Sequence, residues 1–598
     1  MTSLRVGEHK EALVARVKVL SRAVGVALAM IAGAFWFVQV LEGSHYRELA
    51  ENNRLRKISI EAPRGTIYDR TGRVLVENLP SYNLSLDRSR AEDLPASVAF
   101  AARVLERPAA ELDRILERYR GVALYQPVLL AEGLALDEVA RFKVAELEHP
   151  EFAIDITHRR LYRLGAHAAH VLGYLGEVRA EEIAQPLSPY RSGDLIGRRG
   201  VERAYDRRLR GEDGERVVVV DSRGQPVEEF GREVGRPGAA LRLTLDADLQ
   251  QEAERLLEGQ VGAVVALDPR NGEIRALVSA PAYDPNLFAR RLAVEDWQRL
   301  VSDPFHPLQN RALQSTYSPG SVFKIVVATA ALAERAVDTD WGVFCNGSAE
   351  HYGRRFHCWK RGGHGWMNLE SALKYSCDVY FYALGQKLGI ERIAEYARKF
   401  DLGQPTGVDL EGEKTGLVPD PAWSERVRKH PWYAGETISV AIGQGALLTT
   451  PLQVATMVAA VANGGRLVTP HLVADAPVPA PRPLDLPPGV LEPVRRGLWR
   501  VVNDAGTGAA ARVPGLEIAG KTGTVQVVSH EAYEDTSSLP WEKRNHAWFA
   551  SYAPAAAPEL VLVVFIEHGG QGSKAAAPLA KALYERFFES DLGAAAAS

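Results

Sequence analysis

The most informative segment of this sequence is Ser315-Thr-Tyr-Ser-Pro-Gly-Ser-Val-Phe-Lys-Ile-Val-Val-Ala-Thr-Ala330. Its Pro319-Gly320 pair is a turn signal, and the apolar run that follows has the spacing of a buried helix. Ser321 is therefore expected in the first helical turn, where free backbone N–H groups favour negative charge. Lys324 follows on the same helix face, so an amine kept neutral by burial could accept the serine proton. Alone, Ser-x-x-Lys is a weak signal, because an ordinary helix start looks the same.

Two further elements support this interpretation. Lys521-Thr522-Gly523 lies within a β-branched, alternating segment, which predicts a strand that passes close to another part of the chain at its glycines. A second Lys-Thr-Gly at 414–416 lies in a charged, proline-flanked loop, and we interpret it as unrelated. Ser376-Cys377-Asp378 opens an apolar run between the other two elements. Aspartate at 378 keeps an oxygen acceptor but lacks the amide donor of the commoner asparagine.

Taken together, these elements resemble the monofunctional class B penicillin-binding proteins, most closely the elongation-specific penicillin-binding protein 2 group. The resemblance extends over nearly the whole chain, through Trp432–Thr437, Ser439–Gly445, Thr449–Gln453 and His546–Phe549. It implies a peptidoglycan D,D-transpeptidase that cross-links stem peptides through a serine acyl-enzyme during cell elongation and is inhibited by β-lactams. It also implies a cell-wall and cell-shape function without an organic cofactor.

The resemblance assigns a role to each site residue. The implied catalytic residues are Ser321, Lys324, Ser376, Asp378 and Lys521, and the implied substrate-binding residues are Thr522, Gly523 and Thr524. Ser321 would attack the D-alanyl-D-alanine carbonyl, with Lys324 as base, hydrogen-bonded to Ser321 and Ser376. Ser376 would relay a proton to the leaving amine, and Asp378 would orient Lys324 or the substrate amide. Lys521 would supply positive charge beside the two threonine hydroxyls, which would bind the terminal carboxylate. Backbone N–H groups of Ser321 and Thr524 would form the oxyanion hole.

The N-terminal region predicts a membrane anchor. Residues 23–41 carry no charge and are about as long as a bilayer core is thick, and they follow a basic segment at 1–22. A buried soluble helix would show a polar face, and a cleaved signal peptide would end in small residues rather than Val40-Leu41-Glu42. We predict an uncleaved single-pass anchor in the bacterial inner membrane, with most of the chain in the periplasm.

The rest of the 598-residue chain predicts two large domains of α+β class. Residues 43–240 resemble the β-rich pedestal, or dimerisation, module of class B enzymes, with helices inserted between Ala91 and about Leu147. Residues 241–590 are expected to form the penicillin-recognising transpeptidase domain, a sheet with helices on its faces, including a helical block from Ser321 to about Phe400. Residues 591–598 are expected to be a flexible tail. A net charge of −4 gives no sign of a nucleic-acid partner.

All three cysteines fall in one stretch, as Cys345, Cys358 and Cys377, with His364 between the last two. Three soft ligands and one imidazole suit a tetrahedral zinc ion, and we predict a structural zinc site. Glycines 362, 363 and 365 would allow the tight backbone path of such a site. A Cys345–Cys358 disulfide or unrelated thiols are the alternatives, with His351 and His357 as substitute ligands. Some penicillin-binding protein 2 members carry a zinc site in this region.

Two other function classes stay open. A D,D-carboxypeptidase or other hydrolase on the same fold would use water in place of the acceptor amine. A scaffold would mainly activate a polymerase, and the resemblance implies a RodA-type membrane glycosyltransferase and other elongation-complex proteins as partners. The intact serine and lysine elements argue against a purely non-catalytic protein.

Overall fold

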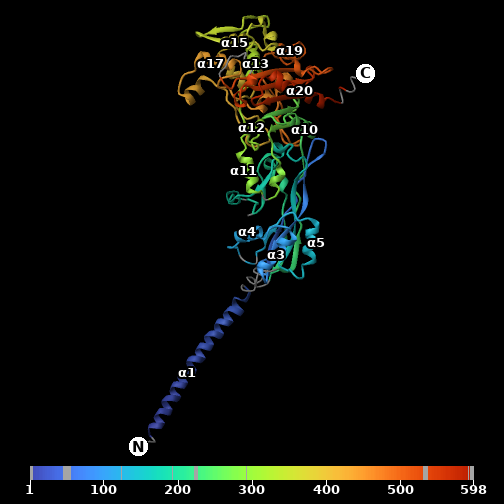
Figure 1. The fold of residues 1–598 in the computed structure, drawn as a ribbon. Coiled ribbons are helices and arrows are strands. Elements are labelled where there is room, and N and C mark those ends of the chain that lie inside the picture. Colours follow the sequence, from blue (N-terminus) through green and yellow to red (C-terminus); the bar gives the residue numbers. More distant parts are fainter. Residues whose placement is uncertain are drawn as a thin grey trace. The chain divides into compact units, whose positions relative to one another are not determined.

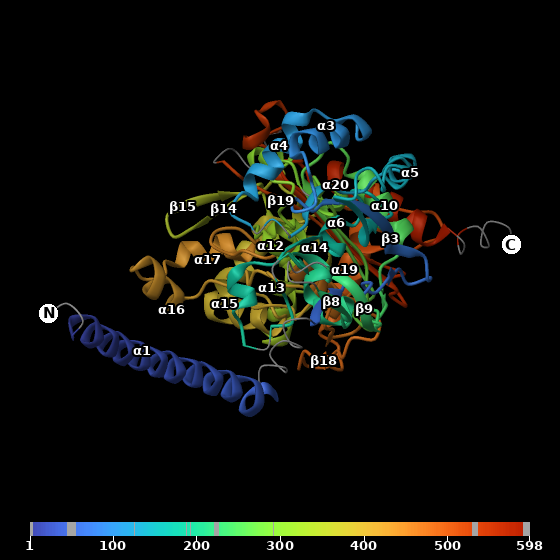
Figure 2. The ribbon, with the colours of Figure 1, turned by 90° about the horizontal axis from the view of Figure 1, so that it is seen from below.

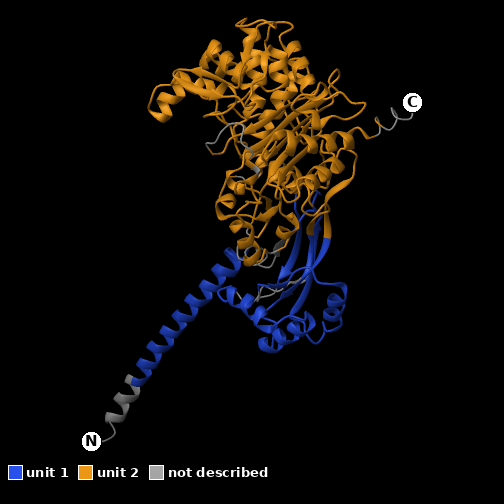
Figure 3. Cartoon of the chain, turned by 45° about the horizontal axis from the view of Figure 1, so that its top comes forward, with its two compact units in different colours: residues 1–63, 80–158, 211–237 blue, residues 64–79, 159–210, 238–598 orange. Residues whose placement is uncertain are grey.

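The computed structural model describes residues 4–44, 55–122, 124, 126–186, 188–191, 193–220, 226–290, 292–528, 536–589 and 592 (Figure 1). The chain divides into two compact units, drawn in separate colours in Figure 3. Unit 1 comprises residues 1–63, 80–158 and 211–237, and unit 2 comprises residues 64–79, 159–210 and 238–598. The predicted tail at 591–598 lies outside the described residues except for Leu592.

Unit 1 begins with the long helix α1 (Leu4–Trp36), which continues into the π-helical turn η1 (Phe37–Leu41). Residues Leu13–Leu41 span 29 residues and include an 18-residue window with a mean hydropathy of 2.1, so this helix is long and apolar enough to cross a membrane. This apolar segment thus includes almost three helical turns before Ala23, where the sequence placed the start of the anchor. Long Lys and Arg side chains at a helix end can reach polar surroundings, which allows this extension past Arg16 and Arg22.

The rest of unit 1 combines sheets with three short helices. An antiparallel sheet of β1 (Leu55–Ile60), β8 (Gly214–Val220) and β9 (Pro226–Glu233) has the order β1-β8-β9. The second half of β3 (Val74–Leu86) pairs with β4 (Val128–Ala131). Helices α3 (Leu94–Val104), α4 (Ala109–Arg118) and α5 (Leu136–Val144) share a hydrophobic core with these strands, as the sequence predicted for this insertion.

Unit 2 is built on a five-stranded antiparallel sheet of order β12-β11-β21-β20-β19. Its strands are β11 (Gly262–Leu267), β12 (Ile274–Ala280), β19 (Ala519–Val525), β20 (His546–Ala553) and β21 (Leu560–Ile566). Alternate side chains of β11 enter different cores, so that Ala263 and Val265 face one core while Val264 and Ala266 face the other. A sheet covered on both faces needs apolar residues at every position, and β21 (LVLVVFI) satisfies this requirement.

Helices cover the two faces of this sheet (Figures 1 and 2). On one face α10 (Ala247–Leu256) and α20 (Gly572–Phe587) share a core with the strands. On the other face α13 (Lys324–Ala333), α15 (Asp378–Lys399) and α18 (Pro451–Ala462) form the larger core. This arrangement confirms the predicted α+β class with helices on the faces of a sheet.

The helical block predicted from Ser321 to about Phe400 is wrong in its middle. After α13 the chain forms two hairpin-like pairs, β13 (Val343–Cys345) with β16 (Gly365–Met367) and β14 (Ser348–His351) with β15 (Arg354–His357). Helices resume with α14 (Leu369–Lys374) and α15. Glycines 347, 353, 363 and 365 all have positive φ, a backbone conformation that interrupts a helix and permits tight turns.

Apart from α19 and β5, which have 13 and 11 residues, the remaining elements have fewer than ten residues each. They are β2 (Ile67–Tyr68), β5 (Phe152–Tyr162), α6 (Ala169–Leu172), β6 (Leu175–Glu177), α7 (Ala180–Ile183), β7 (Leu195–Gly197), α8 (Gly200–Ala204), α9 (Asp206–Arg210), β10 (Leu241–Arg242), η2 (Pro285–Phe288), α11 (Val294–Ser302), α12 (Arg311–Gln314), η3 (Gly320–Phe323), α16 (Pro421–Trp423), η4 (Ser424–Arg428), α17 (Ala434–Ala441), β17 (Arg466–Leu467), β18 (Arg482–Pro483), α19 (Leu491–Asn503), η5 (Ala509–Ala511), η6 (Thr536–Ser538) and η7 (Trp541–Lys543). Ser321 therefore lies in a 3₁₀ turn, and the α-helix proper begins at Lys324.

Candidate active site and thiol cluster

The turn that carries Ser321 is fixed between two other segments of unit 2. Gly320 has φ +54° and its N–H donates to the carbonyl of Gly443 at 2.9 Å. A Cβ at position 320 would lie 2.9 Å from the Val525 side chain and 3.0 Å from the Thr524 carbonyl, so glycine permits this close approach to β19. The indole N–H of Trp548 donates to the Ser318 carbonyl at 3.1 Å. The serine is thus held against the Lys-Thr-Gly strand, with its side chain partly exposed.

Lys324 is fully buried, and its Nζ donates three hydrogen bonds. The acceptors are the Ser376 carbonyl at 3.0 Å, the Ser376 Oγ at 3.2 Å and the Asp378 Oδ1 at 2.7 Å. The predicted bond between Lys324 and Ser376 is present. The predicted bond to Ser321 is absent among the described residues, because an ammonium group has three donors and all three are used. Catalytic hydrogen bonds that are absent from a free enzyme often form when the substrate binds.

The triplet 376–378 places its first and third side chains on Lys324. Ser376 has φ +53°, a left-handed conformation that costs a non-glycine residue about 1–3 kcal/mol and is typical of functional sites. Asp378 begins α15, where the helix dipole favours a carboxylate. Its second oxygen, Oδ2, accepts the backbone N–H of Trp359 at 3.1 Å. Both carboxylate oxygens of Asp378 are therefore engaged.

Burial acts on the charges of this site in opposite directions. Burial raises the pKa of the Asp378 carboxyl, and the neighbouring Lys324 only partly opposes this shift. Burial, followed by the positive charge of Lys324, lowers the pKa of the Lys521 amine well below its usual range. Lys521 is fully buried and donates to the Thr522 carbonyl at 3.0 Å. The free protein therefore disfavours the second positive charge that the sequence interpretation placed at Lys521.

The threonines of the Lys-Thr-Gly strand have further partners. Thr522 Oγ1 lies 2.7 Å from Thr507 Oγ1 in the loop after α19, and the Thr524 hydroxyl accepts the Gly572 N–H at 3.4 Å. A Cβ at Gly523 would lie 3.0 Å from the Trp548 Cβ and 3.1 Å from the Pro319 carbonyl. This glycine therefore allows the strand to pass directly beside the turn that carries Ser321, as its position in the motif predicted.

The second Lys-Thr-Gly, at 414–416, forms no strand. The Lys414 N–H donates to the Leu313 carbonyl, and the Thr415 carbonyl accepts from the Gln453 side chain. These contacts hold a loop in place and involve none of the catalytic candidates, which agrees with its interpretation as unrelated.

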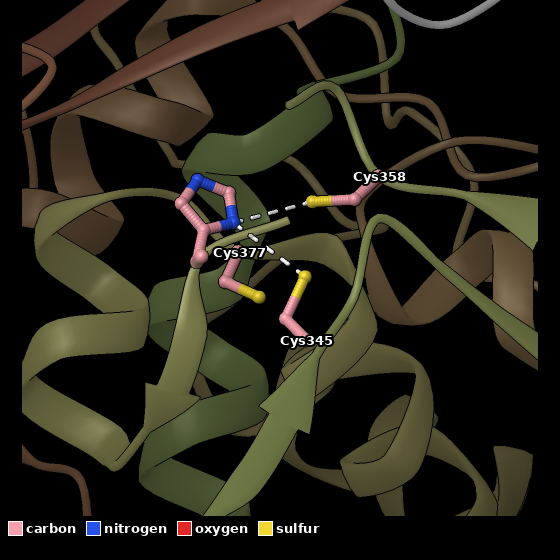
Figure 4. Close-up of side chains that lie close together, drawn as sticks. Cys345, Cys358 and Cys377 are labelled. Atoms are coloured by element: carbon pink, nitrogen blue, oxygen red, sulfur yellow. Dashed lines mark hydrogen bonds between the residues drawn. The ribbon is translucent and has the colours of Figure 1, made fainter. Parts of the chain in front are cut away.

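The three cysteines and His364 form a thiol cluster (Cys345, Cys358, His364, Cys377; Figure 4). Their ligand atoms all lie within 4.8 Å of one another, and His364 Nδ1 is 3.7 Å from Cys345 Sγ and 3.5 Å from Cys358 Sγ. The cysteines are buried free thiols, so the alternative of a Cys345–Cys358 disulfide is not what the structure contains. His351 and His357, the substitute ligands, lie outside this group.

The donor set of the thiol cluster fits zinc. A tetrahedral ion with Zn–S of about 2.3 Å and Zn–N of about 2.0–2.1 Å separates sulfur and nitrogen by roughly 3.6 Å, which matches the two S···N distances. Hydrogen bonding with Cys377 lowers the pKa values of Cys345 and Cys358 to about 4, and the burial of both thiols only partly opposes this. Two cysteines with lowered pKa values, a third thiol and an imidazole are ligands that zinc prefers.

Two residues of the site could not be recognised from their sequence positions. Thr507 contacts Thr522 from a Gly506-Thr507-Gly508 turn, where the flanking glycines predict only a loop. Trp359 binds Asp378 through its main chain, an interaction that any residue type could make. The indole N–H of Trp359 also donates to the Tyr375 carbonyl at 3.0 Å, which fixes the loop between the thiol cluster and the triplet.

Comparison with known protein families gives two matches that together span most of the chain. Residues 262–585 match the penicillin binding protein transpeptidase domain, and residues 59–243 match the penicillin-binding protein dimerisation domain.

Individual proteins are similar over a comparable length. The peptidoglycan D,D-transpeptidase MrdA of Acinetobacter baumannii is 34% identical over 578 residues, covering 94% of this chain and 85% of the relative. The complex between penicillin-binding protein 2 and MreC from Helicobacter pylori matches with a TM-score of 0.80 and 28% identity, covering 89% of this chain and 99% of that one. A structure described as the structural coordination of polymerization and crosslinking by a peptidoglycan synthase complex matches with a TM-score of 0.72 and 33% identity. The match covers 95% of this chain and 98% of that one.

Proposed function

Because this chain belongs to the penicillin-binding protein transpeptidase family and is a peptidoglycan D,D-transpeptidase, we propose that Ser321 is its acylated nucleophile. The observation that supports this assignment is the convergence of three elements on one site. The Ser321 turn packs against the Lys521 strand, while Lys324 reaches the Ser376–Asp378 triplet. In the reaction Ser321 Oγ bonds to the penultimate D-alanine carbonyl carbon, and the peptide C–N bond breaks to release D-alanine. An amine of a neighbouring stem peptide then displaces the serine to form the cross-link.

The buried pair of Lys324 and Asp378 supplies the base. A base must first be neutral, and a proton shift from Nζ to Oδ1 across their 2.7 Å hydrogen bond leaves both partners uncharged. The raised pKa of the Asp378 carboxyl favours this shift. Neutral Lys324 then accepts the Ser321 proton, and the Ser376 hydroxyl, already bound to Nζ, passes a proton to the leaving amine.

The Lys521 strand binds the donor carboxylate. A substrate carboxylate beside Thr522 and Thr524 would offset the cost of charging buried Lys521, so this lysine gains its positive charge on binding. The backbone N–H groups of Ser321 and Thr524 then stabilise the oxyanion of the tetrahedral intermediate, which is commonly worth about 3–4 kcal/mol per donor.

Intact-mass analysis of the full chain in detergent, after exposure to a fluorescent penicillin, tests this assignment. We expect one adduct per chain in the wild type and none in Ser321→Ala. Ser318→Ala is the matched control, since this serine precedes Ser321 by three residues and its hydroxyl donates to the Leu447 carbonyl. An adduct that persists in Ser321→Ala would refute the assigned nucleophile.

The acceptor distinguishes transpeptidation from hydrolysis on the same fold. We expect the acyl group to pass to a D-amino acid amine, giving an exchanged stem peptide detectable by mass. Release of only the hydrolysed tetrapeptide, with amine present in excess and the partner polymerase added, would favour the carboxypeptidase alternative.

The thiol cluster is proposed to hold a structural zinc ion through Cys345, Cys358, His364 and Cys377. A four-ligand zinc site stabilises the fold around it, and here two ligands flank the residues that contact Asp378 and Lys324. Metal analysis of the purified full chain should give one zinc per chain, and chelation should lower the unfolding temperature. Cys358→Ser should lose the metal, whereas His351→Ala, outside the cluster, should retain it. A full zinc content in Cys358→Ser would contradict the ligand set.

The specific partner and the membrane location of this chain are proposals that go beyond its family membership. The synthase complex and the MreC complex of related proteins support partners in the elongation machinery, and we propose a RodA-type membrane glycosyltransferase among them. We also propose that Leu13–Leu41 anchors the chain in the bacterial inner membrane with the catalytic unit in the periplasm. Co-purification with the glycosyltransferase should require this helix. Protease added to spheroplasts should digest the catalytic unit, and a protected unit would reverse the assigned topology.

A further inference from the structure

Tyr317 lies four residues before Ser321 and is fixed through its backbone. The Tyr317 N–H donates to the Thr449 carbonyl at 2.9 Å, and the Thr449 N–H donates back to the Tyr317 carbonyl at 2.8 Å. One residue later, the Ser318 carbonyl accepts the indole N–H of Trp548 at 3.1 Å. Only two residues separate this anchored stretch from Ser321. The position of Tyr317 therefore limits where the turn that carries Ser321 can lie.

The Tyr317 ring packs against three aromatic side chains of the five-stranded sheet. Its centroid lies 4.1 Å from the Phe565 ring in β21. The His546 and Trp548 rings in β20 lie 5.8 Å and 6.4 Å away. A phenylalanine at position 317 would make the same ring contacts, so what distinguishes tyrosine here is its hydroxyl group.

That hydroxyl donates to the carboxylate of Glu567, the residue immediately after β21. The accepting oxygen, Glu567 Oε1, also accepts the Nε–H of Arg311 at 2.9 Å. The rest of the Arg311 guanidinium donates to the Phe305 carbonyl at 2.7 Å and to the His306 carbonyl at 3.4 Å. The Arg311 and Glu567 side chains are only 5% and 16% exposed. We call this largely buried set of Arg311, Tyr317 and Glu567 the tyrosine anchor.

The tyrosine anchor is poorly explained as a source of stability. The desolvation cost of a buried ion pair often exceeds its attraction, so apolar side chains of similar volume are commonly as stable. A satisfied buried polar network instead specifies one arrangement of the segments that it joins. Burial, followed by the charge of Glu567, raises the pKa of Tyr317, so its hydroxyl keeps its proton and stays a donor. Such a network is better suited to fixing a position than to adding stability.

From these contacts we infer that Glu567 and Tyr317 are positioning residues, which hold the turn of Ser321 in the geometry that acylation requires. Glu567 acts through the Tyr317 hydroxyl, and Arg311 holds the carboxylate and balances its charge. A displacement of about 1 Å in a reacting group can cost about 10²-fold in rate, so a small shift of this turn is sufficient. The inference rests on the proposed role of Ser321 as the acylated nucleophile.

Penicillin acylation of the full chain in detergent tests the inference. The dependence of the rate on penicillin concentration separates the dissociation constant of the non-covalent complex from the rate constant of acylation, and peptide mass analysis locates the adduct. We expect Tyr317→Phe to form one adduct per chain at Ser321, with a rate constant lower by at least about tenfold. The dissociation constant should stay within about twofold of wild type. Because phenylalanine keeps the ring contacts, this variant should fold.

Tyr584→Phe is the matched control. The Tyr584 hydroxyl is also buried and lies 3.0 Å from the Ser551 Oγ, but it belongs to the core on the α20 face of the sheet. Its removal should lower the unfolding temperature without changing either kinetic constant. If the Tyr317 hydroxyl were merely structural, the two variants would lose stability and retain the same kinetics.

Glu567→Gln tests whether the carboxylate acts through Tyr317. Alone it should lower the rate constant of acylation, and in the Tyr317→Phe background it should change that constant by less than about twofold, because the link is already broken. Wild-type acylation by Tyr317→Phe, an equal loss in Tyr584→Phe, a change confined to the dissociation constant, or independent effects of the two substitutions would overturn the inference. Failure of the proposed function would look different, since the wild type itself would then form no adduct at Ser321.

Discussion

Unit 2 contains two buried ionic clusters whose carboxylates behave in opposite ways. In the pedestal cluster, defined as Arg64, Arg160, Glu202 and Asp206, Glu202 contacts Arg160 at 2.7 Å and Arg64 at 2.9 Å. In the proposed catalytic cluster, defined as Lys324, Ser376, Asp378 and Lys521 and called the catalytic cluster below, Asp378 contacts one lysine at 2.7 Å. Although burial opposes ionisation in both, the two arginines hold the pKa of Glu202 below its usual range, whereas the pKa of Asp378 is raised.

The difference shows how a structural ion cluster can be told from a catalytic one. Arginine cannot lose its proton in a protein, so the pedestal cluster is fixed in one charge state. Lysine can, and the catalytic cluster has two lysines, one of which already has a lowered pKa. A cluster that can exchange protons internally is suited to acid–base chemistry, and one that cannot is suited to holding segments together.

The largest effect is expected from Lys324→Met. Loss of the base should slow penicillin acylation by up to about 10⁴-fold, equivalent to about 5.5 kcal/mol of activation free energy. Loss of one partner of a buried pair is destabilising, but the Asp378 carboxyl, whose pKa is raised, can take up a proton and become neutral, so the fold should persist with lowered stability. Stopped-flow acylation and thermal unfolding measure both quantities. Lys414→Met, in the unrelated Lys-Thr-Gly, should acylate normally. A Lys324→Met protein that acylates within tenfold of wild type would remove the distinction between the clusters.

Glu202→Gln should show the reverse pattern, with a large loss of stability and a normal acylation rate per folded molecule. Removing the carboxylate leaves two buried arginines with too little compensating charge, which should cost about 3 kcal/mol of unfolding free energy. Denaturant unfolding measures the loss. Asp475→Asn, which breaks the exposed Arg208–Asp475 pair, should cost less than about 1 kcal/mol. Equal losses in these two variants would show that burial is not the deciding factor.

Asp378→Asn should have an intermediate effect. Asparagine retains an oxygen acceptor for Lys324 but cannot take up its proton, so we expect acylation to fall by about tenfold, or about 1.4 kcal/mol. Acylation kinetics with the same penicillin provide the measurement. A loss of a thousandfold would mean that the carboxylate takes part directly in the reaction, and no loss would show that its proton is not used.

The smallest effect concerns the pH dependence of stability. The pKa of Lys521 is lower in the folded chain than its unfolded value of about 10.4, so between these two values the unfolded chain binds more protons. Stability should therefore rise with pH through this window, by at most about 1.4 kcal/mol per pH unit from this group. Lys521→Met should remove that contribution. Unfolding free energies measured up to pH 10 test it, and an identical slope in wild type and variant would contradict the lowered pKa.

The sequence predicted those parts of the fold that repeat a simple pattern. The apolar run after Ser321 and the alternating residues around Lys521 led to elements whose observed bounds differ by only a few residues. The predicted helical block was wrong in its middle because the isolated glycines and aromatic residues there show no strand periodicity in the sequence. Hairpins such as β14–β15 are stabilised by strand pairing, which exists only in the folded chain. The N-terminal helix begins at Leu4, well before the uncharged run at 23–41 that predicted the membrane anchor.

The sequence named the candidate site residues that the fold brings together, but not the hydrogen bonds between them. Motif spacing predicted Ser321, Lys324, Ser376 and Lys521. The occurrence of all three cysteines and His364 in one stretch predicted the four members of the thiol cluster, which the fold brings together. Their zinc ion stays a prediction. The orientation of the Lys324 amine depends on the positive φ of Ser376 and on a carboxylate held by a main-chain N–H. Neither of these determinants has a sequence signature.

The triplet 376–378 serves two centres at once, with consequences for how this enzyme can evolve. Ser376 and Asp378 bind Lys324, while Cys377 between them belongs to the thiol cluster. An insertion or deletion here would displace both centres together, so drug selection has little freedom to alter this side of the site. Thr507 reaches the site from a separate loop and contacts only one residue of the Lys-Thr-Gly motif through its side chain. Resistance to β-lactams should therefore arise by changes in the loop around Thr507 before it arises by changes in the triplet.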